Sequence, residues 1–391
     1  MKILYIADFL YFDVGGAKMS ARIHLRTLQE IYGAENIRVA ALIGSKGTRD
    51  KIDNTHMVFT TSGNPIRLFL NCLAGYGTFI NRHIIMKILT MIKEEKINVV
   101  FVDNSIYGIL VMKIKQIYPC MPIISYYHDV KAVLGKEWRQ HATILKRPVY
   151  SAMIKNERIN QKFCDVNLTL NSRETERFAK EYKYQPEGEL RVYLDIPFTF
   201  NVSNRPLNSD RLDLLFIGSS YTPNIKGINW FIDNVLPELK GDIYLTVAGS
   251  GMDRKYKERD YPSNVCFYGK VDDLSELYCS HDVIICPIFE GAGMKVKVAE
   301  AMGYGKIIIG TQEAYIGYKE SVDVDKWNKF FYHCNDANEF IESINSISAN
   351  VKSIKRYNPE VRNLYEKNFS IEYGKRTIES MIELAVKKTN S

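Results

Sequence analysis

The chain has 391 residues, of which 46% are hydrophobic and 25% are charged, and its formal net charge is +7. Because this length exceeds the usual size of one domain core, we expect two domains, and the composition excludes a disordered or low-complexity protein. Seven cysteines without a C-x-x-C pair argue against a disulfide framework or a zinc site. The chain also lacks the apolar core of a signal peptide and any apolar run as long as a membrane span. We therefore expect a cytoplasmic protein, at most peripherally bound to the inner face of the cell membrane.

Short apolar segments alternate with helical stretches in the first half of the chain. The expected strands are residues 2–7, 37–44, 98–104, 122–129, 165–171 and 189–194. This alternation is typical of a parallel sheet covered by helices. Ligands bind at the carboxyl ends of the strands in such sheets, so the residues that follow each strand are candidates for a site.

Two groups of polar or small residues follow strands in the first half. Gly15 and Gly16 open a helix after the first strand, but the G-x-G-x-x-G spacing of a dinucleotide site is missing. Both a loop that faces a ligand and a plain entry turn fit this segment. His128 and Asp129 end the strand at 122–129. We predict a site role for His128, because an imidazole can hydrogen-bond sugar hydroxyls or a developing charge.

Charge is divided unevenly between the two halves. Residues 1–205 contain 29 Lys and Arg against 19 Asp and Glu, whereas residues 206–391 contain 23 against 26. A basic first half fits an anionic membrane or a lipid phosphate as partner, and it also fits an ordinary solvated surface. The candidate membrane contacts lie in an expected helix at 146–162 and are Lys146, Arg147, Lys155, Arg158 and Lys162.

A segment rich in Asn, Ser and Pro, residues 198–211, is expected to link the two domains. The strands expected after it are residues 212–219, 243–251, 265–271, 282–288, 306–311 and 330–334, and a final helix is expected at about 370–388. The predicted fold class is therefore α/β, with two tandem Rossmann-like doubly wound domains that face a cleft.

The first strand of the second half leads into a turn at Gly218 and Ser219. Pro223 and Asn224 then begin a helix that carries Lys226 near its start. Pro before a helix and Asn as its cap have a purely structural explanation. The same helix N-terminus could also bind an anion, so both interpretations remain open.

The segment EGAGMKVKVAEAMGYGKIIIG, residues 290–310, combines glycines, two lysines and two glutamates ahead of an apolar strand. Glycines allow backbone N–H groups to approach a phosphate, and Lys295 and Lys297 add positive charge. If a helix begins near Lys297, Glu300 lies in its first turn and can accept hydrogen bonds from two adjacent hydroxyls. We therefore predict a nucleotide site here.

Several other motifs are absent or weak. The chain contains neither the P-loop pattern nor H-E-x-x-H, and GSGMDR at 249–254 lacks the third glycine of a dinucleotide fingerprint. Asp323 and Asp325 form a D-x-D pair, but the pair falls between a helix and a loop, where we expect solvated surface. We therefore predict no metal site and no required cofactor.

Together these segments resemble GT-B fold glycosyltransferases of family 4. The similarity covers the whole chain and is strongest from 214 to 317, in LLFIGSSYTPNIKGINWFIDNVLPEL, VCFYGKVDDLSELYCSHDVIICPI and EGAGMKVKVAEAMGYGKIIIGT. TLNSRETERF, residues 169–178, resembles the segment that ends the acceptor domain of this family.

The resemblance implies a role for each matching residue. Glu300 would hold the nucleotide ribose and Glu290 would face the donor sugar, although nine residues separate them here instead of the usual seven. The implied catalytic residues are His128, Lys297 and Glu290, and the implied acceptor-side residues are Asp13, His128 and Asp129. The implied donor-binding residues are Gly16, Gly218, Ser219, Asn224, Lys226, Val271, Gly293, Met294, Lys295, Lys297 and Glu300.

The resemblance also implies a function and a division of labour. Residues 1–200 would bind the acceptor, residues 206–370 the nucleotide-diphosphate-sugar, and the helix at 371–391 would pack back toward the first domain. The expected activity is retaining hexosyl transfer without metal, to a saccharide or a lipid-linked oligosaccharide in surface polysaccharide assembly. A sugar-nucleotide epimerase of similar fold and a non-catalytic partner subunit are the alternatives, and no nucleic acid partner is expected.

Overall fold

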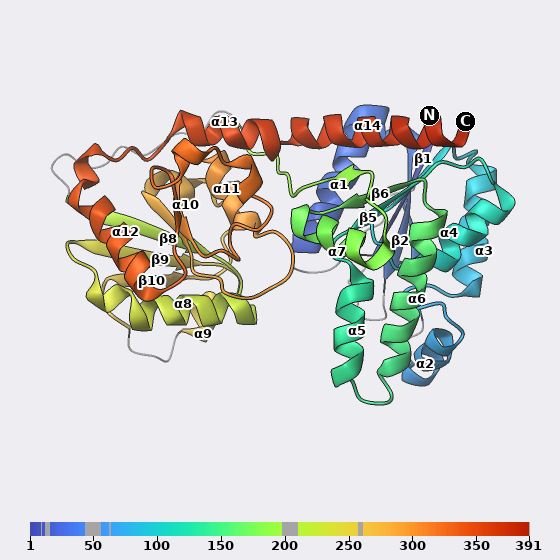
Figure 1. Ribbon diagram of the computed structural model, residues 1–391, viewed down its shortest axis with the longest axis horizontal. Coiled ribbons are helices and arrows are strands. Elements are labelled where there is room, and N and C mark those ends of the chain that lie inside the picture. Colours follow the sequence, from blue (N-terminus) through green and yellow to red (C-terminus); the bar gives the residue numbers. More distant parts are fainter. Residues whose placement is uncertain are drawn as a thin grey trace. The chain divides into compact units, whose positions relative to one another are not determined.

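The computed structural model describes residues 1–8, 10–11, 16–43, 56–61, 64–197, 210–256 and 261–390. Contacts within the chain divide it into two compact units. Unit 1 consists of Met1–Arg191 and Ile371–Ser391, and unit 2 consists of Val192–Ser370. Each unit is a sheet with helices packed on its faces (Figure 1).

The described part of unit 1 contains a seven-stranded sheet whose pairings are all parallel. The residues of the central strands are fully buried, as expected when helices cover both faces. The strand order is β3-β2-β1-β4-β5-β6-β7, with bounds β1 (Ile3–Ala7), β2 (Ile37–Ile43), β3 (His56–Thr60), β4 (Val99–Val102), β5 (Ile123–Tyr127), β6 (Val166–Thr169) and β7 (Gly188–Glu189).

Helices connect the strands of unit 1, and a helix from the far end of the chain completes it. Apolar residues of α3 and α4, such as Ile88 and Leu110, share one core cluster with strand residues. α14 contacts α1, and Lys375 Nζ lies 3.1 Å from the Glu30 carboxylate. The helices are α1 (Gly16–Tyr32), α2 (Pro65–Leu73), α3 (Arg82–Glu94), α4 (Gly108–Ile117), α5 (Lys131–His141), α6 (Arg147–Phe163), α7 (Ser172–Tyr182) and α14 (Ile371–Asn390).

Two of these helices, α5 and α6, form a hairpin that extends beyond the sheet, with α2 beside α6 (Figure 1). The close packing of α4 on α6 requires glycine at position 108, because a Cβ on Gly108 would lie 2.0 Å from the backbone oxygen of Asn156. The turn between α5 and α6 carries two exposed apolar side chains, Ile144 and Leu145.

The described part of unit 2 contains a six-stranded parallel sheet with the order β10-β9-β8-β11-β12-β13. Successive strands run outward in one direction from β8 to β10 and in the other from β11 to β13, so the strand order reverses between β8 and β11. Such a reversal is where open α/β sheets bind ligands. The strands are β8 (Leu212–Ile217), β9 (Ile243–Ala248), β10 (Val265–Tyr268), β11 (Val283–Cys286), β12 (Ile307–Gly310) and β13 (Phe331–His333).

The helices of unit 2 follow the strands in the same alternating pattern. They are α8 (Thr222–Asn234), α9 (Met252–Lys255), α10 (Ser275–Ser280), α11 (Val296–Gly303), α12 (Ala337–Ala349) and α13 (Pro359–Asn368). Within the described residues of both units, no helix combines the length and the apolar composition that crossing a membrane requires.

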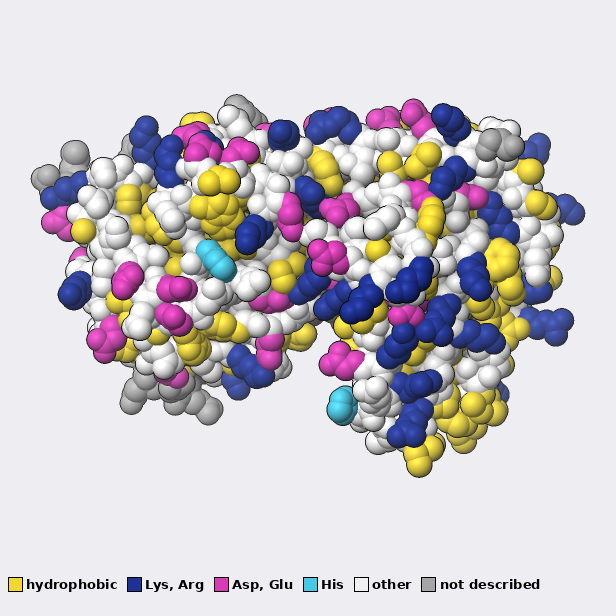
Figure 2. Space-filling model, viewed as in Figure 1, with side chains coloured by type: hydrophobic (Ala, Val, Ile, Leu, Met, Phe, Trp, Pro, Cys, Tyr) yellow, Lys and Arg dark blue, Asp and Glu magenta, His cyan; other side chains and the backbone are white. Residues whose placement is uncertain are grey.

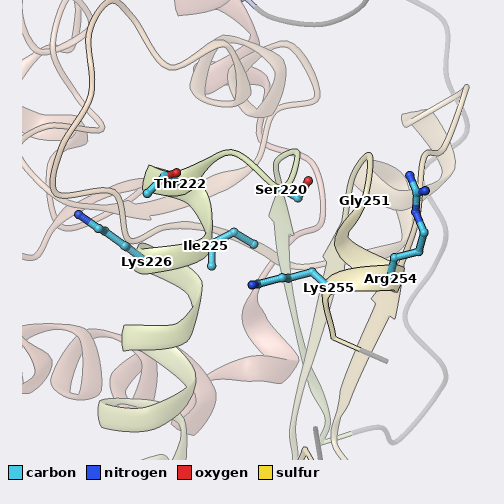
Figure 3. A pocket seen from close by; sticks show the side chains of 7 residues that line it. All are labelled: Ser220, Thr222, Ile225, Lys226, Gly251, Arg254 and Lys255. Atoms are coloured by element: carbon cyan, nitrogen blue, oxygen red, sulfur yellow. The ribbon is translucent and has the colours of Figure 1, made fainter. Parts of the chain in front are cut away.

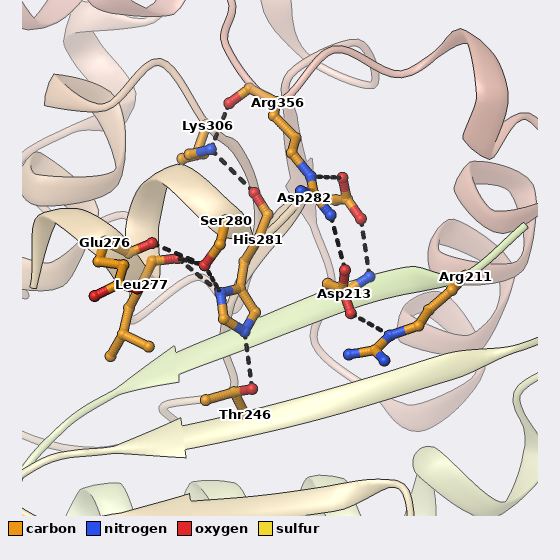
Figure 4. Close-up of polar contacts among 10 residues, drawn as sticks. All are labelled: Arg211, Asp213, Thr246, Glu276, Leu277, Ser280, His281, Asp282, Lys306 and Arg356. Atoms are coloured by element: carbon orange, nitrogen blue, oxygen red, sulfur yellow. Dashed lines mark hydrogen bonds and ion pairs between the residues drawn. The ribbon is translucent and has the colours of Figure 1, made fainter. Parts of the chain in front are cut away.

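A network of charged side chains joins the amino ends of the unit 2 strands (Figure 4). Arg356 donates to Asp282 at 2.9 Å through Nε and to Asp213 at 2.8 Å through Nη2. Lys306 Nζ donates to the backbone oxygen of His281 at 3.0 Å and to that of Arg356. The network thereby ties the starts of β8, β11 and β12 to the segment before α13.

The sequence predicted the fold class and most of the elements correctly. The two units are Rossmann-like, and eleven of the twelve expected strands coincide with observed ones within a few residues. The strand expected at 189–194 is wrong: the pairing ends at Glu189, and Leu194 bridges Ser370 within unit 2. The strand β3 was not predicted, because its edge position buries only Phe59 of five residues and leaves no apolar run. Residues 198–209 of the expected linker lie outside the described residues.

Candidate functional site

The N-termini of α8 and α11 meet at the carboxyl edge of the unit 2 sheet, because β8 and β11 are neighbouring strands. Lys297 Nζ, from the first turn of α11, donates to Asn224 Oδ1 at 2.9 Å. Asn224 Nδ2 in turn donates to the backbone oxygen of Ser219 at 3.0 Å. Of the two interpretations left open for Asn224, the helix cap does not hold, since α8 begins at Thr222 and the Asn224 amide instead supports Lys297.

Lys297 is a buried ammonium without a carboxylate partner among the described residues. Its side chain is 9% exposed, and Nζ lies 4.0 Å from the centroid of the Phe216 ring. Burial lowers the pKa of Lys297 to about 8. An anion beside Nζ would stabilise the charged form, so this position favours a negatively charged ligand.

Lys295 caps the same helix and is held by the segment around it. Gly291 and Gly293 have φ values of +129° and +70°, a region that favours glycine. Lys295 Nζ lies 2.8 Å from Glu313 Oε1 and 3.1 Å from the backbone oxygen of Gly293. Met294 is buried beneath the turn. Lys295 is thus close to the two helix N-termini but engaged by a carboxylate.

Glu300 lies in the second turn of α11, not the first, because the helix begins at Val296. Burial raises the pKa of Glu300. The hydrogen bond from Tyr278 and the charge of Lys297 act in the opposite direction but do not cancel this rise. Tyr278 donates to Oε2 at 2.9 Å, and its ring stacks on Tyr304. Among the described residues no donor contacts Oε1, so this oxygen can accept hydrogen bonds from a ligand.

Glu290 and Lys226 form an exposed ion pair, with Oε1 and Nζ 2.7 Å apart. Gly291, next to Glu290, approaches Pro223 in the first turn of α8. Exposed pairs contribute little stability, so a charged ligand could replace either partner at small cost.

A pocket of about 600 Å³ opens beside the first turn of α8 (Figure 3). Three cationic side chains line it, those of Lys226, Arg254 and Lys255. The sequence analysis selected only the first of these three, because GSGMDR lacks a complete fingerprint. The informative signal was a strand followed by closely spaced glycines and a short helix. The other lining residues are Ser220, Thr222, Ile225 and Gly251.

Glycine is required where β9 ends beside this pocket. Gly249 has a φ of +153°, and a Cβ there would lie 2.0 Å from the backbone oxygen of Gly218. The turns after β8 and β9 can therefore touch only through glycine. Val271, one of the implied donor-binding residues, is partly buried beyond β10 and does not line the pocket.

In unit 1, His128 follows β5 and lies against a buried carboxylate. Its Nε2 is 3.0 Å from Asp103 Oδ1, and His24 Nδ1 is 3.3 Å from Asp103 Oδ2. Burial alone would lower the pKa of His128, but Asp103 and Asp8 outweigh it and raise the pKa above its ordinary value. Burial raises the pKa of Asp8 to about 6. The sequence analysis missed His24, Asp8 and Asp103, although Asp8 and Asp103 also follow strands.

The other expected acceptor-side residues are less informative. Asp129 Oδ2 pairs with Lys131 Nζ at 2.7 Å, and its buried Oδ1 has no hydrogen-bond partner among the described residues. Asp13 lies outside the described residues, and Gly16 is the first residue of α1. In unit 2, Asp325 of the D-x-D pair contacts Lys326 at 2.6 Å on the exposed surface.

Comparison with known proteins identifies the domain that carries the two lysines and Glu300. Residues 211–350 match the family described as glycosyl transferases group 1. This part of unit 2 is a glycosyl transferase domain. A curated relative from Klebsiella pneumoniae, described as an uncharacterized 44.6 kDa protein in the cps region, is 28% identical over 123 residues. The match spans 27% of this chain and about a third of that relative, 32% of its length.

Solved structures extend the comparison over the whole chain and show the GT-B fold. The lipopolysaccharide outer core galactosyltransferase WaaB is 16% identical with a TM-score of 0.67, covering 98% of this chain and 99% of its own. HepE of Anabaena in complex with UDP is 14% identical with a TM-score of 0.68, covering 98% and 100%. The sucrose-phosphate synthase of Thermosynechococcus elongatus is also 14% identical with a TM-score of 0.68, covering 98% of both chains. The glycosyl transferase domain thus belongs to a chain of GT-B architecture.

Proposed function

We propose that the protein is a retaining glycosyltransferase of the family 4 kind that transfers a hexose from a nucleotide-diphosphate-sugar, bound by unit 2, to a saccharide acceptor. The observation that carries the proposal is the junction of the α8 and α11 N-termini, with Lys297 and Glu300 on one helix. Two helix N-termini and a buried ammonium favour a diphosphate. The open Oε1 of Glu300 suits a ribose diol.

In this proposal the chain's own cations stabilise the leaving group. Negative charge develops on the diphosphate as the bond to the anomeric carbon breaks, and Lys295 and Lys297 offset it without a metal ion. The acceptor hydroxyl attacks from the face that the diphosphate leaves, which retains the anomeric configuration, and a phosphate oxygen takes the hydroxyl proton. In unit 2, Glu290 would contact the transferred sugar, and His128 is the proposed catalytic residue of unit 1.

The test of donor binding is calorimetry with UDP and UDP-sugars, since structures of HepE contain UDP and UDP-glucose. Glu300→Gln should weaken binding by about 1–3 kcal/mol, the size of a lost charge-assisted hydrogen bond. Glu342→Gln, on the exposed surface of α12, is the matched control and should bind as the wild type does. Equal affinity of all three proteins for every nucleotide tested would refute the ribose assignment.

Product analysis separates the proposal from its two alternatives. A transferase releases nucleotide diphosphate and extends the acceptor, whereas an epimerase converts the nucleotide-sugar with no acceptor present. A non-catalytic subunit would turn over neither. EDTA should leave turnover unchanged, and a strict need for Mg²⁺ or Mn²⁺ would restore Asp323 and Asp325 as candidate ligands.

The proposed acceptor is a lipid-linked oligosaccharide of surface polysaccharide assembly. Two similar proteins support this choice: WaaB is a lipopolysaccharide outer core galactosyltransferase, and the Klebsiella pneumoniae relative lies in the cps region. Unit 1 would then work at the cytoplasmic face of the membrane. Its surface chemistry supports this, because Lys and Arg side chains gather on one face of the unit (Figure 2).

The α5–α6 hairpin combines that basic surface with an apolar tip. Ile144 and Leu145 in its turn are 80% and 73% exposed. The neighbouring helix α2 exposes Ile66, Leu70 and Leu73, which recur at helical spacing. Of the five expected cationic contacts, Arg158 instead pairs with Glu181 at 2.9 Å. An apolar tip within a basic surface is typical of proteins that bind anionic membrane interfaces.

Vesicle sedimentation tests the membrane contact. Binding to vesicles with acidic lipid should weaken with added salt and should fall when the five charges from Lys146 to Lys162 are reversed. Ile144→Ser with Leu145→Ser should also reduce binding, whereas Met86→Ser, which changes another exposed apolar residue, on α3, should not. Equal pelleting with acidic and neutral vesicles for all variants would favour a soluble acceptor.

A further inference from the structure

A second pocket of unit 2 lies at the carboxyl ends of β12 and β13, outside the donor site described above. It has a volume of about 360 Å³, within the usual range of small-molecule sites. The loop after β12, the turn before β13 and the end of β13 form it. The lining residues are Gln312, Tyr315, Lys319, Trp327, Asn328 and His333.

Aromatic rings form a fixed wall of this pocket. Tyr315 is buried, and its hydroxyl donates to the backbone oxygens of Ile308 at 2.8 Å and Tyr332 at 3.2 Å. The Trp327 ring meets Tyr315 edge to face, with centroids 5.1 Å apart. Trp327 also contacts Phe331. The indole is therefore held in place but remains partly exposed, and it lines the pocket.

Polar groups line the rest of the pocket and are exposed. Within the described residues, the side chains of Gln312, Asn328, Lys319 and His333 make no hydrogen bond or ion pair, and neither does the Trp327 indole N–H. Amides and an imidazole ring offer hydrogen-bond partners that match sugar hydroxyls, which both donate and accept. The lining contains no carboxylate and only one lysine, so neither a cation nor a diphosphate matches it.

We propose that this pocket binds a pyranose residue of a saccharide, at a carbohydrate site separate from the donor site. The C–H face of a pyranose packs on an aromatic ring, whose face is electron-rich, while its hydroxyls reach surrounding amides and imidazole. The indole of Trp327 supplies the ring, and Gln312, Asn328 and His333 supply the hydrogen bonds.

The pocket is connected to the proposed donor site through one short segment of the chain. Gln312 lines the pocket, and the next residue, Glu313, holds Lys295 at the α11 N-terminus. One short segment thus touches both a saccharide site and the phosphate-binding turn. A saccharide chain held at this pocket would be retained on unit 2 independently of the nucleotide.

Saturation-transfer NMR with methyl glycosides of glucose, galactose, mannose, N-acetylglucosamine and glucuronate tests the proposal on the full-length protein. At least one glycoside should bind, and Trp327→Ala should weaken that binding by about tenfold or more, as expected for a central aromatic contact. Gln312→Ala with His333→Ala should also weaken it; these exposed side chains can be removed without loss of the fold. Trp138→Ala, an exposed tryptophan of unit 1, is the control and should leave binding unchanged.

A further variant distinguishes glycoside binding in this pocket from glycoside binding in the donor site. Glu300→Gln should not change glycoside binding if the pocket is the site, whether or not donor binding itself behaves as proposed. Binding that is lost in Glu300→Gln but kept in Trp327→Ala would place the sugar in the donor site and overturn the inference. Failure of every glycoside to bind, or equal binding by wild type and both pocket variants, would overturn it as well. Uridine that displaces the bound glycoside from both the wild type and Glu300→Gln would show a nucleoside site instead.

Discussion

The two edges of the unit 2 sheet each hold a buried lysine, and the two lysines are satisfied in opposite ways. Lys306, at the amino edge, donates to the backbone oxygens of His281 and Arg356 and is fully buried. Lys297, at the carboxyl edge, has one side-chain amide and an aromatic face for partners. Burial lowers the pKa of both, to about 7 for Lys306 and about 8 for Lys297.

The surroundings of the two lysines differ in the same sense. At the amino edge, Arg356 bridges Asp213 and Asp282, so the charges there are closed on one another. At the carboxyl edge, no carboxylate of the described residues lies within ion-pair distance of Lys297, and Glu300 acts on it only from farther away. Charges that are paired with one another stabilise the fold. A buried cation without an ion-pair partner can instead gain a favourable interaction when an anionic ligand binds. The following predictions test this division.

The largest expected effect is on the closed edge. Arg356→Met leaves the buried Asp282 without its cation and should lower the free energy of unfolding by about 3–5 kcal/mol, measured in urea. The control is Lys352→Met, which removes an exposed pair with Asp210 and should cost less than about 1 kcal/mol. UDP affinity of folded Arg356→Met should match the wild type. A similar loss of stability in both variants would contradict the division.

The open edge should respond in the opposite direction. Lys297→Met removes a buried charge and should raise the free energy of unfolding near pH 7 by about 3 kcal/mol, the equivalent of a pKa lowered from 10.5 to about 8, while donor binding is lost. Between about pH 8 and pH 10.5 the unfolded wild type binds more protons than the folded wild type, so wild-type stability rises with pH. The difference in stability between Lys297→Met and the wild type should therefore narrow over this range. Lys270→Met, on the exposed surface, should show no such pH dependence. A less stable Lys297→Met protein would refute the argument.

A smaller effect should come from the amide that supports Lys297. Asn224→Ala removes the acceptor for Nζ and should weaken UDP binding by about 1–3 kcal/mol. Because the charged form of Lys297 then loses its partner, UDP affinity should begin to fall at a lower pH than in the wild type. The control for helix integrity is Asn234→Ala at the end of the same helix. The side-chain amide of Asn234 donates a hydrogen bond to the backbone oxygen of Trp230. An unshifted pH profile would show that Asn224 does not hold the ammonium.

The smallest effect concerns His281 in the closed network. Its Nε2 lies 2.8 Å from Thr246 Oγ1, and burial lowers its pKa below 6.5. The unfolded state therefore binds the proton first, and stability should decline as pH falls from 6.5. Melting temperatures between pH 7.5 and pH 5 should fall more steeply in the wild type than in His281→Gln. His141→Gln, at the exposed end of α5, should keep the wild-type slope.

The strands and the glycine- and lysine-containing turn before α11 could be predicted because their signals are local. Strands buried on both faces are short apolar runs, and Lys295, Lys297 and Glu300 follow one of them within a few residues. Glu300 was therefore placed correctly in the helix that follows this strand, although one helical turn too early.

What the sequence could not predict depends on contacts between distant residues. The bond from Lys297 to Asn224 joins positions 73 residues apart, and His24 meets Asp103 across 79. Such pairs follow from strand order, which places β8 beside β11 and β1 beside β4. Local spacing carries no information on that order, so Arg254, Lys255 and Glu313 also escaped the prediction.

The chain leaves unit 1 at Arg191 and returns to it at Ile371, and this order matters during synthesis on the ribosome. The intervening residues of unit 2 take about 10–40 s to translate. Throughout that time the face of α1 that later contacts α14, near Glu30, has no covering helix in the nascent chain. Unit 2 can fold completely as it emerges, whereas unit 1 cannot form its contact between α1 and α14 until the last residues are made. Chaperones that bind nascent chains are therefore expected to engage the first-made half of this protein longest.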